Sequence, residues 1–331
     1  MMKIDFPEGT GKFSGLLTAV LFRFIDFLDI NNETITTYRI KKLRLSNSLD
    51  PKNSNHRNLE KEIGILLQGP IYPVTTFRIC ERYKALYPKV KIVFSTWNTE
   101  SSDEISRIRQ LGIHVIENEI PQIPGPSNIN LQIASTKSGI DYLSTFPITY
   151  VLKNRSDCWL SSDFFLEYFR TLIAHYSNED SRLIVPSYNS FLFRLYSPSD
   201  QIQFGRLETL KFYWDCPLVD EKITDFRFSE SYLVRSMLER QGLIVQNNIQ
   251  ESLAIYRDKF IFADNEQLGF VLNKGSKNWP GNRWAPDGYP QPMSEIQFWI
   301  WLELQAGMEK ILLDYEALPS HGSSESVEDS L

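Results

Sequence analysis

Three charged side chains lie within residues 153–157, where the sequence reads KNRSD directly after an apolar run. Lys153 and Arg155 are cations, and Asp157 is a carboxylate. A reaction that expels a diphosphate must neutralise the charge on the leaving group, which a divalent cation held by carboxylates can do. Asp157 can hold such a cation, and the guanidinium of Arg155 suits bidentate contact with phosphate. An ion-pair network at the end of a strand would explain the same cluster, so this pattern leaves both interpretations open.

A second polar group lies in the segment 124–132, which reads PGPSNINLQ and leads into a predicted helix. Free backbone N–H groups at the start of a helix favour anionic or strongly polar ligands. Asn128 is an acceptable helix cap, which gives it a structural interpretation. Asn130 and Gln132 follow that cap, so capping does not explain them.

Strands and helices alternate along the part of the chain that must position these groups. The apolar runs that predict strands cover residues 63–67, 90–94, 113–116, 149–153 and 183–186. The segments that predict helices cover residues 75–87, 103–111, 130–143, 163–176 and 229–241. This alternation predicts an α/β fold with a mostly parallel sheet flanked by helices, whose ligands bind beyond the carboxyl ends of the strands. The loops QGP at 68–70 and STW at 95–97 are therefore expected at the ligand-binding edge.

The composition excludes several classes of protein. The chain has 331 residues, of which 42% are hydrophobic, and this is enough to bury a large core. Its 41 acidic and 35 basic residues give a net charge of −6, which argues against a nucleic-acid partner. Cys80, Cys158 and Cys216 are odd in number and have no C-x-x-C spacing, so they indicate neither a disulfide framework nor a structural zinc site. A reducing, cytoplasmic compartment fits this cysteine usage.

Residues 1–60 are interpreted as an N-terminal helical extension with a linker. Residues 12–29 carry apolar side chains at helical spacing, but charged residues interrupt them before they reach the roughly 18 apolar residues that a spanning helix needs. Their polar face mixes both signs of charge. This favours packing on the main domain or on a second subunit over peripheral contact with the inner face of the cytoplasmic membrane. The main folded domain is expected at 61–318, and a flexible polar tail at 319–331.

Several short motifs, taken together and in order, resemble those of the WavE-type lipopolysaccharide-synthesis proteins. They are QGP at 68–70, FSTW at 94–97, Asn130 with Gln132 and Ser135, KxRSD at 153–157, Asp200 with FG at 204–205, and SESY at 229–232. The resemblance covers about residues 62 to 275. It implies a GT-A-like glycosyltransferase fold and a nucleotide-sugar donor. The donor contacts that it implies are Gln68, Gly69, Pro70, Thr96, Trp97, Asn130, Gln132, Lys153, Arg155 and Asp157.

The resemblance also places residues 155–157 where GT-A enzymes carry their Asp-x-Asp metal motif. Arg155 stands here in place of the first carboxylate, so Asp157 is the single carboxylate of the motif. A divalent cation, Mn²⁺ or Mg²⁺, would need a second ligand, and His321 can supply it because some GT-A enzymes use a late histidine. Arg155 and Lys153 can instead take over part of the charge neutralisation, so metal dependence stays open. A solvent-exposed histidine in a polar tail is the other interpretation of His321.

An inverting transferase needs a base, because the acceptor hydroxyl loses a proton as it attacks. Glu230 is our candidate, since its position resembles that of the carboxylate that opens the acceptor-side helix in many inverting GT-A enzymes. Asp200 and Asp225 are the reserve candidates. A glutamate in a first helical turn also stabilises the helix dipole, with Ser229 as the cap, so a structural role would explain Glu230 as well.

Aromatic side chains are candidates for the path of the sugar, because their faces stack on the apolar side of sugar rings. Trp97 follows a predicted strand. Trp279, Arg283 and Trp284 lie in a loop rich in proline and glycine, which we interpret as an acceptor contact. Core packing is the ordinary use of tryptophan. We assign three further aromatic residues to a buried helix face: Phe298, Trp299 and Trp301.

These observations predict a glycosyltransferase that moves a sugar from a nucleotide-sugar donor to a surface-polysaccharide acceptor: the lipopolysaccharide core, an O-antigen or a capsule, as a glycan or glycolipid. A sugar-nucleotide nucleotidyltransferase would share the sheet and the diphosphate chemistry. Residues 68–73 (QGPIYP), however, stand where its glycine-rich phosphate loop would lie, and their prolines lack N–H donors. A non-catalytic partner or scaffold protein of a polysaccharide-assembly complex is the alternative from a different class.

Overall fold

The computed structural model describes residues 61–72, 74–176, 181–220, 228–272, 295–307 and 311–312, all of which belong to one compact unit. Several expectations from the sequence lie outside the described residues: the extension at 1–60, the tail at 319–331, Asp225, Trp279, Arg283, Trp284 and His321. None of the described helices has the length and apolar composition that crossing a membrane requires.

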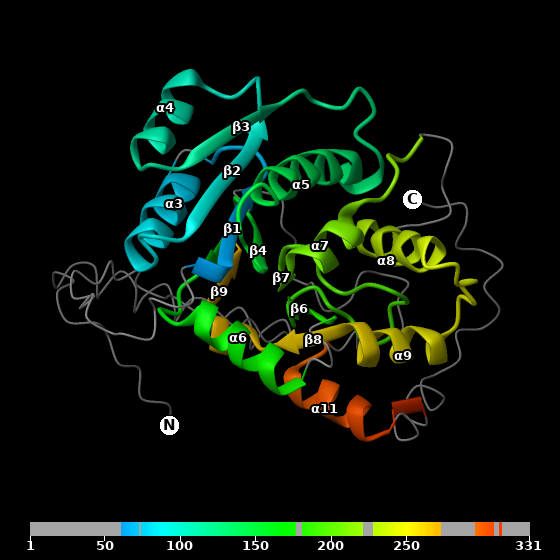
Figure 1. The fold of residues 1–331 in the computed structure, drawn as a ribbon. Coiled ribbons are helices and arrows are strands. Elements are labelled where there is room, and N and C mark those ends of the chain that lie inside the picture. Colours follow the sequence, from blue (N-terminus) through cyan, green and yellow to red (C-terminus); the bar gives the residue numbers. More distant parts are fainter. Residues whose placement is uncertain are drawn as a thin grey trace, which may run out of the picture. The chain divides into compact units, whose positions relative to one another are not determined.

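A seven-stranded sheet forms the centre of the described residues (Figure 1). From one edge to the other, its strands are β3 (His114–Asn118), β2 (Lys91–Trp97), β1 (Ile63–Gln68), β4 (Tyr150–Arg155), β7 (Ile202–Arg206), β6 (Leu183–Pro186) and β8 (Phe260–Ala263). β7 runs antiparallel to its neighbours β4 and β6, whereas every other neighbouring pair is parallel. Six strands therefore point the same way, and the predicted α/β class with a mostly parallel sheet is confirmed.

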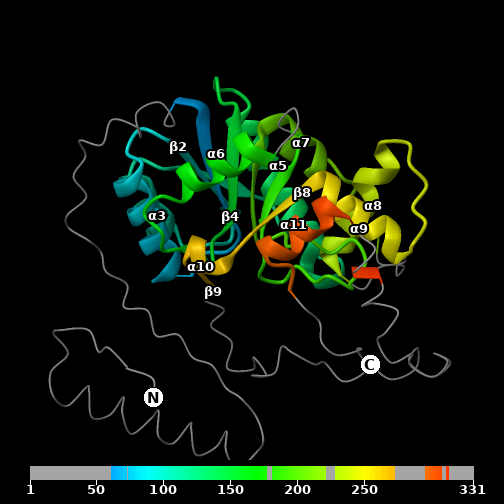
Figure 2. The same cartoon turned by 90° about the horizontal axis from the view of Figure 1, so that it is seen from below.

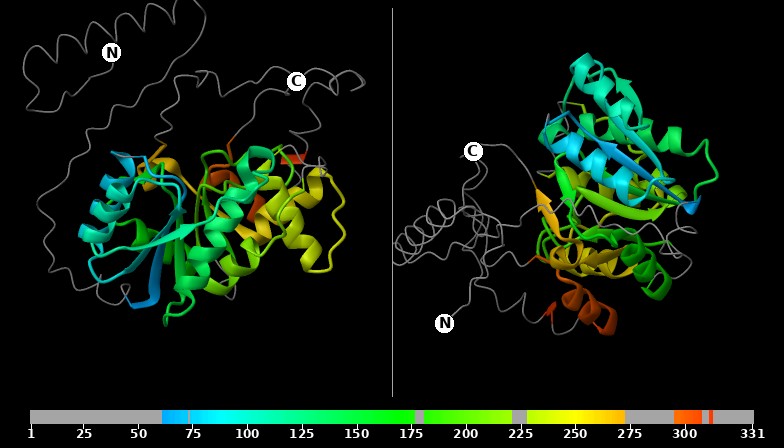
Figure 3. Two further views of the ribbon diagram at one scale, coloured as in Figure 1. Left: turned by 90° about the horizontal axis from the view of Figure 1, so that it is seen from above. Right: turned by 90° about the vertical axis from the view of Figure 1, so that its left-hand side faces the viewer.

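Helices cover both faces of this sheet, as Figures 1 and 3 show. On one face lie α3 (Thr75–Leu86) and α4 (Ser102–Gln110). From the other face α5 (Ile129–Leu143) packs on β1 and β2 and also contacts α7 (Leu207–Trp214). A sheet that is covered on both faces needs apolar side chains on both, so its strands do not alternate between polar and apolar residues. All six residues of β1 are accordingly buried.

The second half of the chain surrounds β6 and β8 with further elements. They are α6 (Phe165–Tyr176), α8 (Ser229–Arg240), α9 (Ile249–Lys259) and α11 (Phe298–Ala306). Figure 2 shows α11 beside α9 and β8, and it contacts both. A separate antiparallel pair consists of β5 (Cys158–Leu160) and β9 (Phe270–Leu272), with the short helix α10 (Asn265–Leu268) before β9.

The predicted strands and helices are found, with ends displaced by at most three residues. The assignment of three aromatic residues to a buried helix face is wrong in one position. Trp301 in α11 is fully buried, but the side chain of Trp299 is 54% exposed. The first five residues of α11, FWIWL, are all apolar, so this part of the sequence does not reveal which side faces solvent.

Gly139 allows α5 to pack closely on β1, and this contact gives a testable prediction. A Cβ atom at this position would overlap the side chain of Leu66, which is buried in the central strand. We expect Gly139→Ala to lower the free energy of unfolding by about 1–3 kcal/mol, because the core has no room for another methyl group. Urea denaturation measures the effect. Ser138→Ala, at a half-buried position of the same helix, is the control and should change little.

Candidate functional site

The strand order brings the candidate residues together at one edge of the sheet. β1 and β4 run in parallel and end side by side, with Gln68 in register with Arg155. β7 runs the opposite way, so the residues that precede it lie beside the carboxyl end of β4. The backbone N–H of Arg155 accordingly donates to the carbonyl of Gln201 over 3.0 Å. Asp200 and the segment 153–157 are therefore neighbours, although the sequence alone did not predict this pairing.

Arg155 and Asp157 form a two-point ion pair at this edge. The guanidinium Nε lies 3.0 Å from Oδ1 of Asp157, and Nη2 lies 2.7 Å from Oδ2. Asp157 is only 1% exposed, whereas a fifth of the Arg155 side chain, 20%, is accessible. Both oxygens of the carboxylate are thus engaged, and Arg155 is the member of the pair that a ligand can reach.

The described residues do not fit a divalent-cation site at Asp157. They contain no group of three or more His, Cys, Asp or Glu side chains that could hold a metal ion. A cation at Asp157 would also have to displace the guanidinium of Arg155 from both carboxylate oxygens. The second ligand that we expected, His321, lies outside the described residues. We therefore derive no chemical step through a metal, and Arg155 is an accessible cation at this edge.

Lys153 lies beneath the site and cannot touch a ligand. Its side chain is fully buried, and its Nζ donates to the backbone carbonyl of Asp200. The same Nζ lies 4.7 Å from the ring centre of Trp214. Burial lowers the pKa of Lys153 to about 8, and the Asp200 carboxylate acts in the opposite direction. The expectation that Lys153 contacts the donor is therefore corrected, because the amine fixes the Asp200 loop from inside the protein.

Asp200 and Glu230, the two catalytic candidates, are buried near each other. Oδ2 of Asp200 has no hydrogen-bond partner in the described part of the chain. Glu230, in the first turn of α8, is 7% exposed, and its carboxylate accepts hydrogen bonds from Asn189 and Ser229. Burial and then the charge of Asp200 raise the pKa of Glu230 from 4.5 to about 7, while Arg194 and hydrogen bonds act in the opposite direction. Such a carboxyl group can exchange a proton near neutral pH.

The raised pKa of Glu230 predicts how stability depends on pH. Between pH 4.5 and about 7 the folded protein holds a proton on Glu230 that the unfolded chain has lost. The contribution of this group to the free energy of unfolding is therefore present at low pH and lost as pH rises through this range. We expect wild type to lose stability relative to Glu230→Gln over the same range. Urea denaturation of both proteins at several pH values measures the difference, and parallel curves would contradict the buried, protonated state.

The QGP loop is tied to the strand end by close contacts. Gly69 has φ of 124°, which L side chains rarely adopt, and a Cβ atom there would lie 2.8 Å from Oγ of Ser156. The same Oγ donates to the carbonyl of Pro70 over 2.7 Å. Nε2 of Gln68 donates to Oγ of Ser135 in α5 over 2.9 Å, and Gln68 is buried. The loop therefore lies beside residues 153–157 as expected, with Pro70 exposed.

The other four expected donor contacts differ in how far the protein itself occupies them. Thr96 and Trp97 are buried at the end of β2. The carboxamide of Asn130 is also buried and bonds the backbone of Ile123 and Val219, which anchors two loops. Nε2 of Gln132 lies 3.5 Å from the carbonyl of Ser127, whereas its Oε1 has no hydrogen-bond partner among the described residues. These side chains shape the edge of the site, and the amide of Asn130 that we expected to contact the donor is occupied.

The structure adds two residues that the sequence did not single out. Asn189 follows β6 and bonds Glu230, and the guanidinium of Arg194 lies 3.8 Å from the ring centre of Phe228 and 4.2 Å from that of Phe191. Both come from the loop beyond the carboxyl end of β6. The sequence could have indicated these two residues through the predicted strand at 183–186, because residues that follow a parallel strand lie at the ligand-binding edge.

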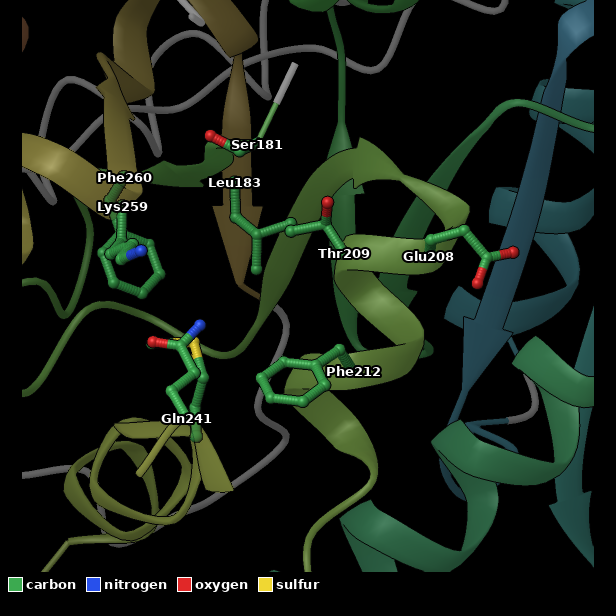
Figure 4. Close-up of a pocket in the computed structure, with 9 residues that line it drawn as sticks. Ser181, Leu183, Glu208, Thr209, Phe212, Gln241, Lys259 and Phe260 are labelled. Carbon is green, nitrogen blue, oxygen red and sulfur yellow. The ribbon is translucent and has the colours of Figure 1, made fainter. Parts of the chain in front are cut away.

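A cavity of about 290 Å³ lies elsewhere in the fold (Figure 4). Leu183 and Phe260, the first residues of β6 and β8, line it together with side chains of α7 and α8. These are the amino ends of parallel strands, opposite to the edge that carries Arg155 and Glu230. Its position alone gives it no role in the chemistry of that edge.

Solved structures with a similar fold share little sequence with this chain. A glycosyltransferase involved in the glycosylation of the major capsid of PBCV-1 is 14% identical, with 65% of this chain and 94% of that chain covered and a TM-score of 0.38. Glucosyl-3-phosphoglycerate synthase from Mycobacterium tuberculosis, in complex with Mn²⁺, UDP and phosphoglyceric acid, is 13% identical. The match covers 63% of this chain and 72% of that chain, with a TM-score of 0.41. A cytidylyltransferase from Leptospira borgpetersenii is 15% identical, with 63% of this chain and 78% of that chain covered and a TM-score of 0.36. Likeness at this level carries no information about substrate.

The sequence itself gives the stronger comparison. No curated protein sequence matches the chain. The family described as WavE lipopolysaccharide synthesis matches residues 63–252, which is more than half of the 331 residues. The matched region runs from β1 into α9 and contains Arg155, Asp157, Asp200 and Glu230. The resemblance drawn from the short motifs is thereby confirmed, and the chain belongs to the WavE lipopolysaccharide synthesis family.

Proposed function

We propose that this protein is a GT-A-like glycosyltransferase that moves a sugar from a nucleotide-sugar donor to a surface-polysaccharide acceptor. The acceptor class is a lipopolysaccharide core, an O-antigen or a capsule glycan. Family membership supports the connection to lipopolysaccharide synthesis. The donor, the acceptor and the catalytic residues belong to the proposal.

One observation carries the proposal: a buried carboxyl group with a pKa near neutral lies at the same edge of the sheet as an accessible arginine. Burial and the charge of Asp200 raise the pKa of Glu230 to about 7, which suits a base at neutral pH. Arg155 presents a guanidinium at the end of β4, where a diphosphate would meet it. An inverting transfer from a nucleotide sugar uses a base for the acceptor hydroxyl and a positive charge for the departing diphosphate.

The proposed reaction divides the chemistry between these two groups. Glu230 accepts the proton of an acceptor hydroxyl as the hydroxyl oxygen attacks the anomeric carbon of the donor sugar. A new glycosidic bond forms, and the bond between the sugar and the diphosphate breaks. The electron pair of that bond leaves on the nucleoside diphosphate, whose charge Arg155 neutralises. The proton ends on Glu230, and solvent removes it after the glycoside has left.

Turnover of a panel of nucleotide sugars tests this proposal. The protein is incubated with uridine-, guanosine-, cytidine- and thymidine-based donors, with and without Mn²⁺, and the released nucleotide is quantified. Release of a nucleoside diphosphate from at least one donor is the expected result. Binding without turnover, even when acceptor glycans are added, would favour a non-catalytic scaffold. Release of pyrophosphate from a nucleoside triphosphate and a sugar phosphate would favour a nucleotidyltransferase.

Several features remain predictions. The domain boundaries at 61–318 and 319–331 and the contact of residues 12–29 with a membrane or a second subunit belong to this group. So do the cytoplasmic location and the acceptor contacts at Trp279, Arg283 and Trp284. A glycolipid acceptor would give the amphipathic segment 12–29 a reason to lie close to a membrane surface.

A further inference from the structure

Asn189 occupies a backbone position that few residue types tolerate, in the loop that follows β6. Its φ of 63° lies in the left-handed region, which asparagine and glycine adopt more readily than other residues. The backbone N–H of Asn189 donates to Oε1 of Glu295 over 2.9 Å, and the next residue, Ser190, accepts a bond from the backbone of Ile296 over 2.7 Å. A segment more than a hundred residues away in sequence therefore fixes this loop.

The side chain of Asn189 reaches from that fixed loop to the candidate base. Its Nδ2 donates to Oε1 of Glu230 over 2.5 Å, while Oγ of Ser229 donates to Oε2 over 3.2 Å. The backbone N–H of Glu230 also favours the ionised carboxylate. Two donors from different elements thus define both the place and the orientation of the Glu230 carboxylate.

The surroundings of Glu230 explain why such a donor matters. Burial and the negative charge of Asp200 oppose ionisation, and the positive charge of Arg194 favours it. The phenol groups of Tyr213 and Tyr256 also lie within electrostatic range of Glu230. An N–H donor stabilises the carboxylate more than the neutral acid. Asn189 therefore favours the ionised form of Glu230, whereas Asp200 favours the neutral form.

We propose that Asn189 is a positioning residue, which orients the Glu230 carboxylate and favours its ionised form so that Glu230 can accept the acceptor proton. This inference rests on the proposed function in assigning Glu230 as the base. A purely structural alternative is that Asn189 is present only because its backbone is left-handed. Glycine at this position keeps the backbone and removes the side chain, so it separates the two roles.

The test uses Asn189→Gly with a matched control. Asn247→Gly makes the same change at another left-handed asparagine, with φ of 54°, which lies in an exposed loop before α9. In each protein, infrared difference spectra against the corresponding Glu230→Gln protein follow the carboxyl band of Glu230 as pH changes. The pH profile of sugar transfer is measured in parallel.

We expect Asn189→Gly to move the Glu230 midpoint to higher pH by about one unit, because a hydrogen bond to the charged form is lost. The acid limb of the transfer profile should move with it. Asn189→Asp, which adds a negative charge beside Glu230, should move both further, and Asn247→Gly should move neither. An unchanged infrared midpoint in Asn189→Gly overturns the inference while the proposed function stands. If Glu230→Gln keeps full transfer activity, Glu230 is not the base, and the proposed role of Asn189 in catalysis is overturned as well.

Discussion

Replacement of Glu230 by glutamine is expected to reduce sugar transfer by about 100- to 10,000-fold, the usual contribution of a general base. Glutamine has nearly the same shape, and its carbonyl oxygen can still accept the hydrogen bond that Asn189 donates. It cannot take a proton from the acceptor hydroxyl. Because Arg155 and the QGP loop are untouched, donor affinity should stay close to that of wild type. Nucleoside diphosphate release at saturating donor, together with calorimetric affinity, measures the two quantities separately.

Glu239→Gln is the matched control for this experiment. Glu239 lies on the same helix but is exposed near its carboxyl end, so its replacement should leave transfer unchanged. A Glu230→Gln protein that fails to fold would support the helix-dipole role of Glu230. The structure places Glu230 in the first turn of α8, with Phe228 rather than Ser229 at the cap position. Full transfer with Glu230→Gln would exclude Glu230 as the base.

Replacement of Arg155 by glutamine is expected to lower the free energy of unfolding by about 3–5 kcal/mol, which is the cost of leaving a buried charge without its partner. Asp157 is 1% exposed, and the guanidinium of Arg155 occupies both of its oxygens. Without that partner the carboxylate has to be solvated, protonated or moved. Urea denaturation at neutral pH measures the loss, and donor affinity should fall as well because the proposed phosphate contact is removed.

The double variant Arg155→Gln with Asp157→Asn separates the ion pair from other effects. Removal of both charges leaves no buried ion without a partner, so we expect the double variant to be more stable than Arg155→Gln alone. A loss below about 1 kcal/mol in the single variant would be typical of an exposed pair and would contradict the burial of Asp157.

β1 to β4 and β6 could be predicted from the sequence, whereas β8 and the place of β7 in the sheet could not. β1 to β4 are long apolar runs separated by helical segments, which is the pattern of parallel strands with crossover helices. β8 has only four residues, Phe260–Ala263, and follows directly from α9. Short apolar runs of this kind cannot be told from a buried helix segment by periodicity. The antiparallel insertion of β7 between β4 and β6 depends on long-range pairing, which a local pattern does not encode.

The same limit explains which site residues the sequence could identify. Arg155, Asp157 and the QGP loop were predicted together because they follow parallel strands, whose carboxyl ends meet at one edge. The burial of Lys153 was not predicted. A lysine at a strand end is an ordinary candidate for ligand contact, and only the identity of the neighbouring strand shows that its side chain is covered. Its amine bonds Asp200, which precedes β7. The proximity of Asp200, Asn189 and Glu230 likewise depends on the order β4, β7, β6.

Hydrogen exchange measured by mass spectrometry tests most directly whether this edge of the sheet is the donor site. The wild-type protein is compared with and without saturating UDP, GDP or CDP, in the presence and absence of Mn²⁺. We predict that one nucleotide slows exchange in peptides that cover residues 68–72 and 155–158, at the carboxyl ends of β1 and β4. Protection confined to residues 181–183, 207–212 and 259–260, around the cavity in Figure 4, would contradict this placement of the site.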